Sequence, residues 1–307
     1  MPETFAQKLL ARKAGLEYVQ PGQIVTVRPD RVLTHDNTSA IARQFAQIGV
    51  DRVFDPAASV VVLDHVTPAA DVTYAVSHQD TRRFVKRHSI AAFYDIGEGI
   101  CHQVLPEYGH AWPGALIVGS DSHTPTHGAF GAFATGIGRT ETAAVLATGR
   151  IWLRVPETIR IEIRGELPPL VTAKDVILHI IGALGADGAD YRSVEFAGEA
   201  IRQMDMSGRM VITNMAAEMG AKNAVFPADK VLQKFIGSNT PGIWADEGAE
   251  YKSSISIDLS EVFPLVAAPH HVDNIKSVAS VAGTVVHEGL IGTCTNGRLS
   301  DLQVAAE

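Results

Sequence analysis

Through residue 154, short apolar runs alternate with segments of helical character. The runs Ser59–Asp64 and Ala115–Gly119 are bounded by Gly, Pro or Asp and predict buried strands. Asp80–His88 and Thr140–Arg150 have the composition of helices. Strands that alternate with helices in this way predict an α/β fold with a mostly parallel sheet.

The pattern changes near Val155–Pro156. Thr158–Arg164 and Tyr251–Leu259 alternate strictly between apolar and polar residues, which is typical of strands with one exposed face. We therefore expect one α/β domain over residues 1–154 and a second over 155–275.

The end of the chain begins another strand–helix unit. Gly283–Gly292 predicts a strand, Cys294 lies in the turn after it, and a helix is expected from about Ser300. One strand and one short helix cannot form a sheet alone. We therefore expect residues 276–307 to be the start of an incomplete third domain.

Charge and apolar runs exclude several classes of protein. The net charge is −8, with 34 acidic and 26 basic residues scattered along the chain and no basic cluster to follow a phosphate backbone. Residues 1–15 lack the apolar core of a signal peptide, and no apolar run reaches the length of a membrane span. Two cysteines make no disulfide framework, so we expect a cytoplasmic protein. From the scattered charges and the short apolar runs, we expect that it binds neither nucleic acid nor membrane.

Three histidines lie beside or near carboxylates in segments that follow predicted strands. They are His65 after Asp64, His102, and His123 close to Asp121. The carboxyl ends of parallel strands are where α/β sites collect. A carboxylate hydrogen-bonded to an imidazole favours the charged ring, which is then a competent proton donor. The pattern predicts acid/base chemistry on an anionic substrate.

The same residues allow a second hypothesis, a divalent-metal hydrolase. Asp121, His123 and His127 have spacings that could hold zinc or a two-metal centre, with Asp64 and His65 as further ligands. A helical zinc-peptidase motif is disfavoured, because a proline between the two histidines breaks the helix.

Cys294 stands out because of its surroundings. It lies in the turn Gly292–Gly297, which is rich in backbone N–H groups and hydroxyls ahead of a predicted helix. Such a setting is expected to lower the pKa of the thiol and favour a thiolate. The alternative is a packed small residue, the role we assign to Cys101.

Seven strings along the chain form a recognisable series. They are Thr34–Thr38, Asp64–His65, Gly97–Gln103, Gly119–Thr124, Thr126–Gly136, Asn214–Gly220 and Gly292–Arg298. In this order they resemble the aconitase superfamily, and the resemblance covers essentially the whole chain. The similarity is greatest to its two-subunit branch, which contains the large subunits of 3-isopropylmalate dehydratase, homoaconitase and dimethylmalate dehydratase.

This resemblance implies a fold, an activity and a partner. The fold would consist of aconitase-like α/β/α domains with mostly parallel sheets. The activity would be that of a hydro-lyase that isomerises a 2-hydroxy di- or tricarboxylate, such as 3-isopropylmalate or homocitrate, by dehydration and rehydration. A 4Fe–4S cluster held by three cysteines would act as Lewis acid. A small swivel-domain subunit would complete a heterodimer or heterotetramer.

The resemblance also implies roles for single residues. Three acid/base pairs are expected: Asp64 with His65, Asp121 with His102, and Glu195 with His123. His65 would protonate the leaving hydroxide. Substrate contacts are expected from His35, Ser122 and Asn296, although single-chain aconitases carry a Gln at the position of His35. Cys294 would be the first cluster ligand.

The chain also departs from the family pattern. Members of the family continue to a Cys-x-x-Cys pair and to further substrate-binding Asn and Arg residues, and the serine base lies in the small subunit of two-subunit members. A lone cysteine cannot hold a cubane, so we expect this chain, as a C-terminally truncated fragment, to lack the cluster and to be inactive alone. A third hypothesis is a non-catalytic paralogue that binds carboxylates or a small subunit. His270 and His271 have no assigned role.

Overall fold

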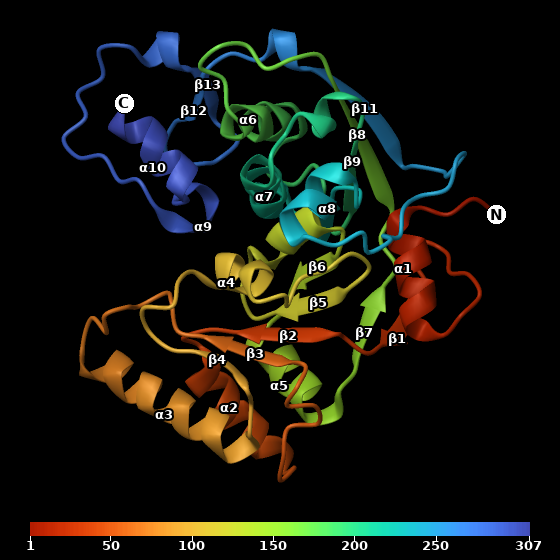
Figure 1. Ribbon diagram of the computed structural model, residues 1–307, viewed down its shortest axis with the longest axis vertical. Helices are drawn as coiled ribbons and strands as arrows, with labels where there is room; N and C mark the ends of the chain where they lie inside the picture. Colours follow the sequence, from red (N-terminus) through yellow and green to blue (C-terminus); the bar gives the residue numbers. More distant parts are fainter.

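A computed structural model describes residues 1–307, and its first half is built on a five-stranded parallel sheet (Figure 1). The strand order is β4-β3-β2-β5-β6, and every neighbouring pair is parallel. The strands are β2 (Arg31–Thr34), β3 (Ser59–Val62), β4 (Ala92–Tyr94), β5 (Leu116–Gly119) and β6 (Phe133–Gly136). The two strands predicted from apolar runs are β3 and β5, and all of their residues are buried.

Side-chain alternation lets this sheet bury both faces. Val61 and Val118 join a core with the helices α2 (Thr38–Ile48), α3 (Val72–His88) and α5 (Arg139–Thr148). Val60 and Ile117 point the other way, into a core that includes residues of α4 (Cys101–Glu107) and the 3₁₀ helix η1 (Thr124–Phe130). In Figure 1, α2, α3 and α5 lie together below the sheet. The predicted helices near residues 80–88 and 140–150 are confirmed as α3 and α5.

The second half contains a four-stranded parallel sheet in the order β10-β9-β8-β11. Its strands are β8 (Thr158–Arg164), β9 (Ser193–Ala197), β10 (Asn223–Val225) and β11 (Ser253–Asp258), and its helices are α6 (Ala173–Leu184), α7 (Met206–Met215) and α8 (Lys230–Ile236). The strands expected from strict alternation are therefore confirmed as β8 and β11. The domain boundaries remain a prediction, although the two sheets fall within residues 31–136 and 158–258.

A smaller antiparallel pair lies beside the N-terminal helix. β1 (Ile24–Val27) pairs with β7 (Ile151–Arg154), and α1 (Phe5–Ala14) packs close to them (Figure 1).

Close backbone contact joins the two halves at η1. Phe226 donates its N–H to the carbonyl of Gly128 at 3.1 Å. A Cβ atom at Gly128 would lie 1.6 Å from the carbonyl oxygen of Ala224, so only glycine fits. From α7, Asn214 Nδ2 donates to Thr126 Oγ1 at 2.8 Å. These contacts fix the turn that follows β5, which carries several of the candidate site residues.

The strand predicted at Gly283–Gly292 is wrong. The chain from β12 (Leu265–Ala267) and β13 (Ile275–Ser277) to α9 (Thr293–Asn296) and α10 (Leu299–Ala306) contains no strand over those residues. A strand needs a hydrogen-bonding neighbour, and none lies alongside this segment. No residue after Val262 is buried. None of the helices combines the length and the hydropathy that a membrane span requires.

Candidate active site

The candidate residues meet at the carboxyl edge of the first sheet. His35 follows β2, Asp64 and His65 follow β3, and Asp121 follows β5. Because β3, β2 and β5 are parallel neighbours, the loops after them leave the sheet at one edge. His102 reaches the same place from the first turn of α4.

His65 lies between two carboxylates. Its Nδ1 is 2.7 Å from Asp64 Oδ1, and its Nε2 is 3.1 Å from Asp121 Oδ2. Both ring nitrogens therefore donate, which requires the imidazolium form. The hydrogen bonds to Asp121 and Asp64 raise the pKa of His65 to about 10. The side chain is 41% exposed, so the charged ring is accessible to a bound molecule.

Asp121 is the centre of the network. Its Oδ1 accepts from His102 Nε2 and from the backbone N–H of His123, each at 2.7 Å. Burial acts to raise the pKa of Asp121, but hydrogen bonds from His102 and His65 outweigh burial and lower it. The contact between Asp121 and His102 matches the expected pair, whereas the bridge to His65 was not predicted.

The expected pairing of Glu195 with His123 is wrong. Glu195 lies on β9, is 1% exposed, and accepts from the Phe5 N–H at 2.7 Å and the Tyr251 hydroxyl at 2.9 Å. These bonds hold Glu195 in the interior of the molecule, where it accepts from α1 and from the segment just before β11. Burial raises the pKa of Glu195.

Glu218 takes the place that was expected for Glu195. His123 Nε2 lies 3.0 Å from Glu218 Oε1, and Glu218 belongs to the 3₁₀ helix η3 (Ala216–Met219), which continues α7. The hydrogen bond raises the pKa of His123 and lowers that of Glu218. Glu218 lies within the matching string Asn214–Gly220, which was the available signal, but its distance in sequence from His123 concealed the contact.

His35 packs directly on the charged ring. The rings of His35 and His65 stack with centroids 4.0 Å apart. Asn37 Nδ2 donates to His35 Nε2 at 2.7 Å, which leaves the Nδ1 of His35 as the protonated nitrogen of a neutral ring. Burial and then the positive charge of His65 lower the pKa of His35. That Nδ1 is buried without a partner.

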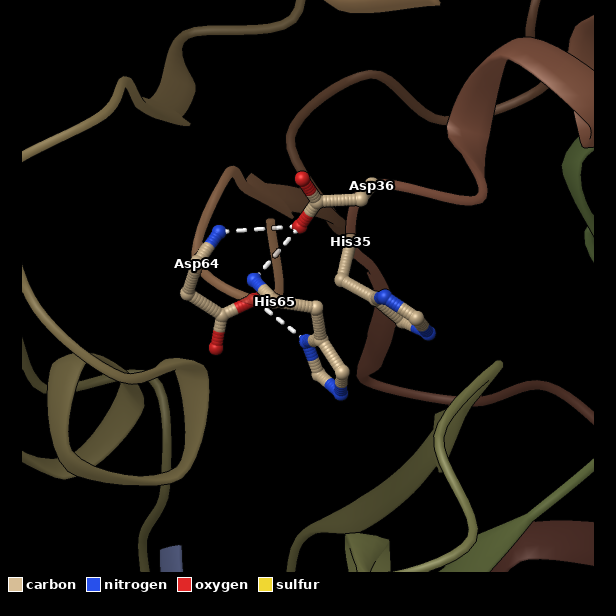
Figure 2. A group of neighbouring side chains, drawn as sticks. All are labelled: His35, Asp36, Asp64 and His65. Carbon is tan, nitrogen blue, oxygen red and sulfur yellow. Dashed lines mark hydrogen bonds and ion pairs between the residues drawn. The ribbon is translucent and has the colours of Figure 1, made fainter. Parts of the chain in front are cut away.

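Another carboxylate, Asp36, supports the loop that carries His65 (Figure 2). Its Oδ2 accepts from the backbone N–H groups of Asp64 at 2.9 Å and His65 at 2.7 Å. Its Oδ1 accepts from Val66 N at 3.3 Å and from His78 Nε2 at 2.7 Å. Asp36 and His78 were not among the predicted site residues, because nothing in their local sequence shows that Asp36 binds the backbone of residues 64–66 or that His78 binds Asp36.

These contacts argue against a divalent-metal centre. His35, Asp36, Asp64 and His65 have potential ligand atoms within 4.8 Å of one another. However, Asp36 already accepts four hydrogen bonds, and both nitrogens of His65 are protonated donors. The predicted hydrolase ligand His127 points its Nε2 at His102 instead, at 3.2 Å. We therefore interpret His35, Asp36, Asp64 and His65 as a hydrogen-bond network rather than as a set of metal ligands.

Cys294 lies at the edge of this network, on α9. Asn214 Nδ2 donates to its Sγ at 3.3 Å, and the turn borders a cavity of about 590 Å³ that is also lined by Ile100, Ser207 and Arg298. The expected fall in thiol pKa is wrong: burial raises the pKa of Cys294, although the Asn214 bond opposes the rise. Burial in the folded chain therefore favours the thiol form of Cys294 over the thiolate.

The remaining predicted residues have smaller contacts. Ser122 Oγ lies 3.4 Å from His123 Nδ1, and Asn296 Nδ2 donates to Asp301 at 2.9 Å, so substrate contact by either residue remains a prediction. Cys101 is fully buried in the core, in agreement with a packing role.

His270 and His271 are exposed in the loop between β12 and β13. They make no hydrogen bond with the network around Asp121.

The fold and the site define an α/β protein with an acid/base network at the carboxyl edge of a parallel sheet, and comparison of sequences establishes its family. The sequence profile of the aconitase family (aconitate hydratase) matches residues 7–307. The chain therefore belongs to the aconitase family.

Its relatives place it within that family. It is 49% identical over 311 residues to a probable 3-isopropylmalate dehydratase large subunit of Methanothermobacter thermautotrophicus, covering 100% of this chain and 74% of the relative. It is 48% identical to a probable methanogen homoaconitase large subunit of the same organism, covering 98% and 72%. The 3-isopropylmalate dehydratase large subunit of Moorella thermoacetica is 44% identical, with coverage of 100% and 74%. These homologues are hydro-lyase large subunits of the aconitase family.

Proposed function

We propose that this chain carries the acid/base half of a hydro-lyase that isomerises a 2-hydroxy di- or tricarboxylate. The observation that carries the proposal is His65, an accessible imidazolium between Asp64 and Asp121. Dehydration of a hydroxy acid needs a proton for the departing hydroxyl, and a positioned acid that is charged at neutral pH supplies it.

The geometry suggests how the proton leaves and returns. Nε2 of His65 has the longer of its two hydrogen bonds, so this nitrogen is the proposed donor to the hydroxyl. Asp64 keeps the Nδ1 proton and with it the orientation of the ring. Asp121, whose pKa is lowered, stays ionised and favours reprotonation of His65 when water adds again.

Substrate recognition is proposed for the residues around this donor. His123, whose pKa is raised by Glu218, adds positive charge for a substrate carboxylate. His35 offers a buried N–H without a partner, and we keep Ser122 and Asn296 as further proposed contacts.

Enzymes of the aconitase family generally use a 4Fe–4S cluster. The residues of this chain do not by themselves fit such a cluster, because it is held by cysteine thiolates and only Cys294 lies at the site. We propose Cys294 as one ligand, with Asn214 as a donor to its sulfur. The acid/base steps above are assigned only to the side chains of this chain.

The substrate and the partner follow from the relatives' names. Relatives of nearly equal identity, 49% and 48%, are named for 3-isopropylmalate dehydratase and homoaconitase, so 3-isopropylmalate and homocitrate are both proposed substrates. Both relatives are named large subunits, which supports a small-subunit partner in a heterodimer or heterotetramer. A cytoplasmic setting is part of the proposal, since both cysteines are free thiols.

The decisive experiment adds the remaining cluster ligands and a small subunit to this chain. The unmatched quarter of the Methanothermobacter dehydratase relative would be joined to this chain, which covers 74% of that relative, and the chimera combined with the relative's small subunit and anaerobic iron and sulfide. We expect turnover of 3-isopropylmalate or homocitrate. His65→Asn should lower kcat by about 100-fold or more, whereas Glu195→Gln should not. A chimera that holds its cluster and is equally active with His65→Asn would disprove the proposed role.

A further inference from the structure

His127 is a buried histidine that the proposed chemistry does not use. It lies in η1, is 0% exposed, and its Nε2 is 3.2 Å from His102 Nδ1. Its own Nδ1 is buried without any hydrogen-bond partner. One proton lies between His102 Nδ1 and His127 Nε2, and either ring can be its donor.

The hydrogen bonds of His102 limit which of its ring nitrogens can carry a proton. Its Nε2 is 2.7 Å from a carboxylate oxygen of Asp121, which accepts, so this nitrogen carries a proton. Only the protonation of His102 Nδ1 is open. Either Nδ1 accepts from His127 and the ring of His102 is neutral, or Nδ1 donates to His127 and the ring is an imidazolium.

The two arrangements differ in whether they leave an unpartnered N–H group and a positive charge in the protein interior. If His127 donates through Nε2, its unpartnered Nδ1 is a lone pair, and both rings are neutral. If His127 accepts, its unpartnered Nδ1 must carry a buried N–H, and His102, which is 1% exposed, must carry a buried charge. Orphaned buried N–H groups are rare, and a buried charge is costly. Burial also lowers the pKa of His127 well below its ordinary value, so this ring is not itself charged.

We propose that His127 is a positioning residue that donates its Nε2–H to Nδ1 of His102 and holds His102 as the neutral Nε2–H tautomer. The neutral ring of His102 then donates a hydrogen bond to Asp121 but brings no positive charge to balance the negative charge of the Asp121 carboxylate. The full charge of Asp121 faces His65, and the transferable proton of the network is on His65 rather than on His102.

Nitrogen-15 NMR of the full chain, with labelled histidine, tests the proposal at neutral pH. We expect one pyrrole-like and one pyridine-like ring nitrogen for both His102 and His127. His127→Gln identifies the His127 signals by their loss and keeps an amide N–H near the Nε2 position, so the pattern of His102 should persist. His127→Leu removes the donor, and the pyridine-like signal of His102 should move downfield. His78, buried against Asp36, is the internal control and should not change.

Two results would overturn the proposal. The first is a His102 with two pyrrole-like nitrogens beside a His127 whose Nε2 is pyridine-like. The second is a His102 spectrum that His127→Leu leaves unchanged. The wild-type measurement decides the first point even where the Leu variant does not fold. The readout needs neither cluster nor turnover, so its failure is distinct from failure of the proposed hydro-lyase activity.

Discussion

Replacing Asp36 by Asn should loosen the loop that holds His65. The carboxylate accepts four hydrogen bonds, from Asp64 N, His65 N, Val66 N and His78 Nε2. An amide has only one acceptor oxygen, and its NH₂ group faces the two donors on the other side.

The size of the effect follows from how those donors can respond. With the amide oxygen toward Asp64 and His65, the ring of His78 can change tautomer and accept from the amide. The N–H of Val66 then loses its partner, and the bonds that remain lose their ionic character. Leaving one half-buried donor unmet and weakening charge-assisted bonds should lower the free energy of unfolding by about 2 kcal/mol.

Urea unfolding followed by circular dichroism measures this loss, and hydrogen exchange of the amides of residues 64–66 locates it. Asp71→Asn is the matched control, because Asp71 is an exposed helix N-cap bonded to Tyr74 N, and Asn caps as well as Asp does. Equal stability of the two variants, with unchanged protection at residues 64 and 65, would refute the reasoning.

The same substitution has a predictable pH dependence. Burial acts to raise the pKa of Asp36, but hydrogen bonds from the His65 N–H and from His78 lower it overall. A carboxylate with a lowered folded pKa stabilises the fold above its unfolded value, near 3.8, and loses that contribution as the pH falls further. Asp36→Asn should therefore flatten the acid-induced loss of stability.

Three further predictions concern the site. Because the folded pKa of His65 is about 10 against an ordinary 6.5, its stabilisation is complete below the lower value and is lost as the pH rises through the higher one. His65→Gln should flatten that decline in urea unfolding measured across this window. In an NMR titration, Glu218→Gln should lower the pKa of His123, and Glu195→Gln should leave it unchanged; the opposite result would restore the original pairing. Cys294, whose pKa burial raises, should react with iodoacetamide at pH 8 more slowly than free cysteine does, and an equal or faster rate would contradict its burial.

Local patterns in the sequence determined much of the fold and part of the site. The apolar runs ending at Asp64 and at Gly119 predicted β3 and β5, because a strand buried on both faces needs no polar positions. The chemistry after those strands, at His65 and Asp121, followed from the rule that parallel strands release their loops at one edge. The Asp64–His65 contact joins adjacent residues, and the resemblance to the aconitase superfamily had implied this pair.

What only the tertiary structure decided involves partners far apart in the chain. Glu218 reaches His123 because α7 packs on η1, and sequence spacing carries no information on that packing. Gly283–Gly292 has the composition of a strand, but strand formation depends on a neighbour that composition cannot show. The pKa of Cys294 rises because burial by the tertiary fold outweighs the hydrogen bond that favours the thiolate. The sequence thus determined which groups could do chemistry, and packing decided their partners and charges, since electrostatic energies depend on distance and burial in space.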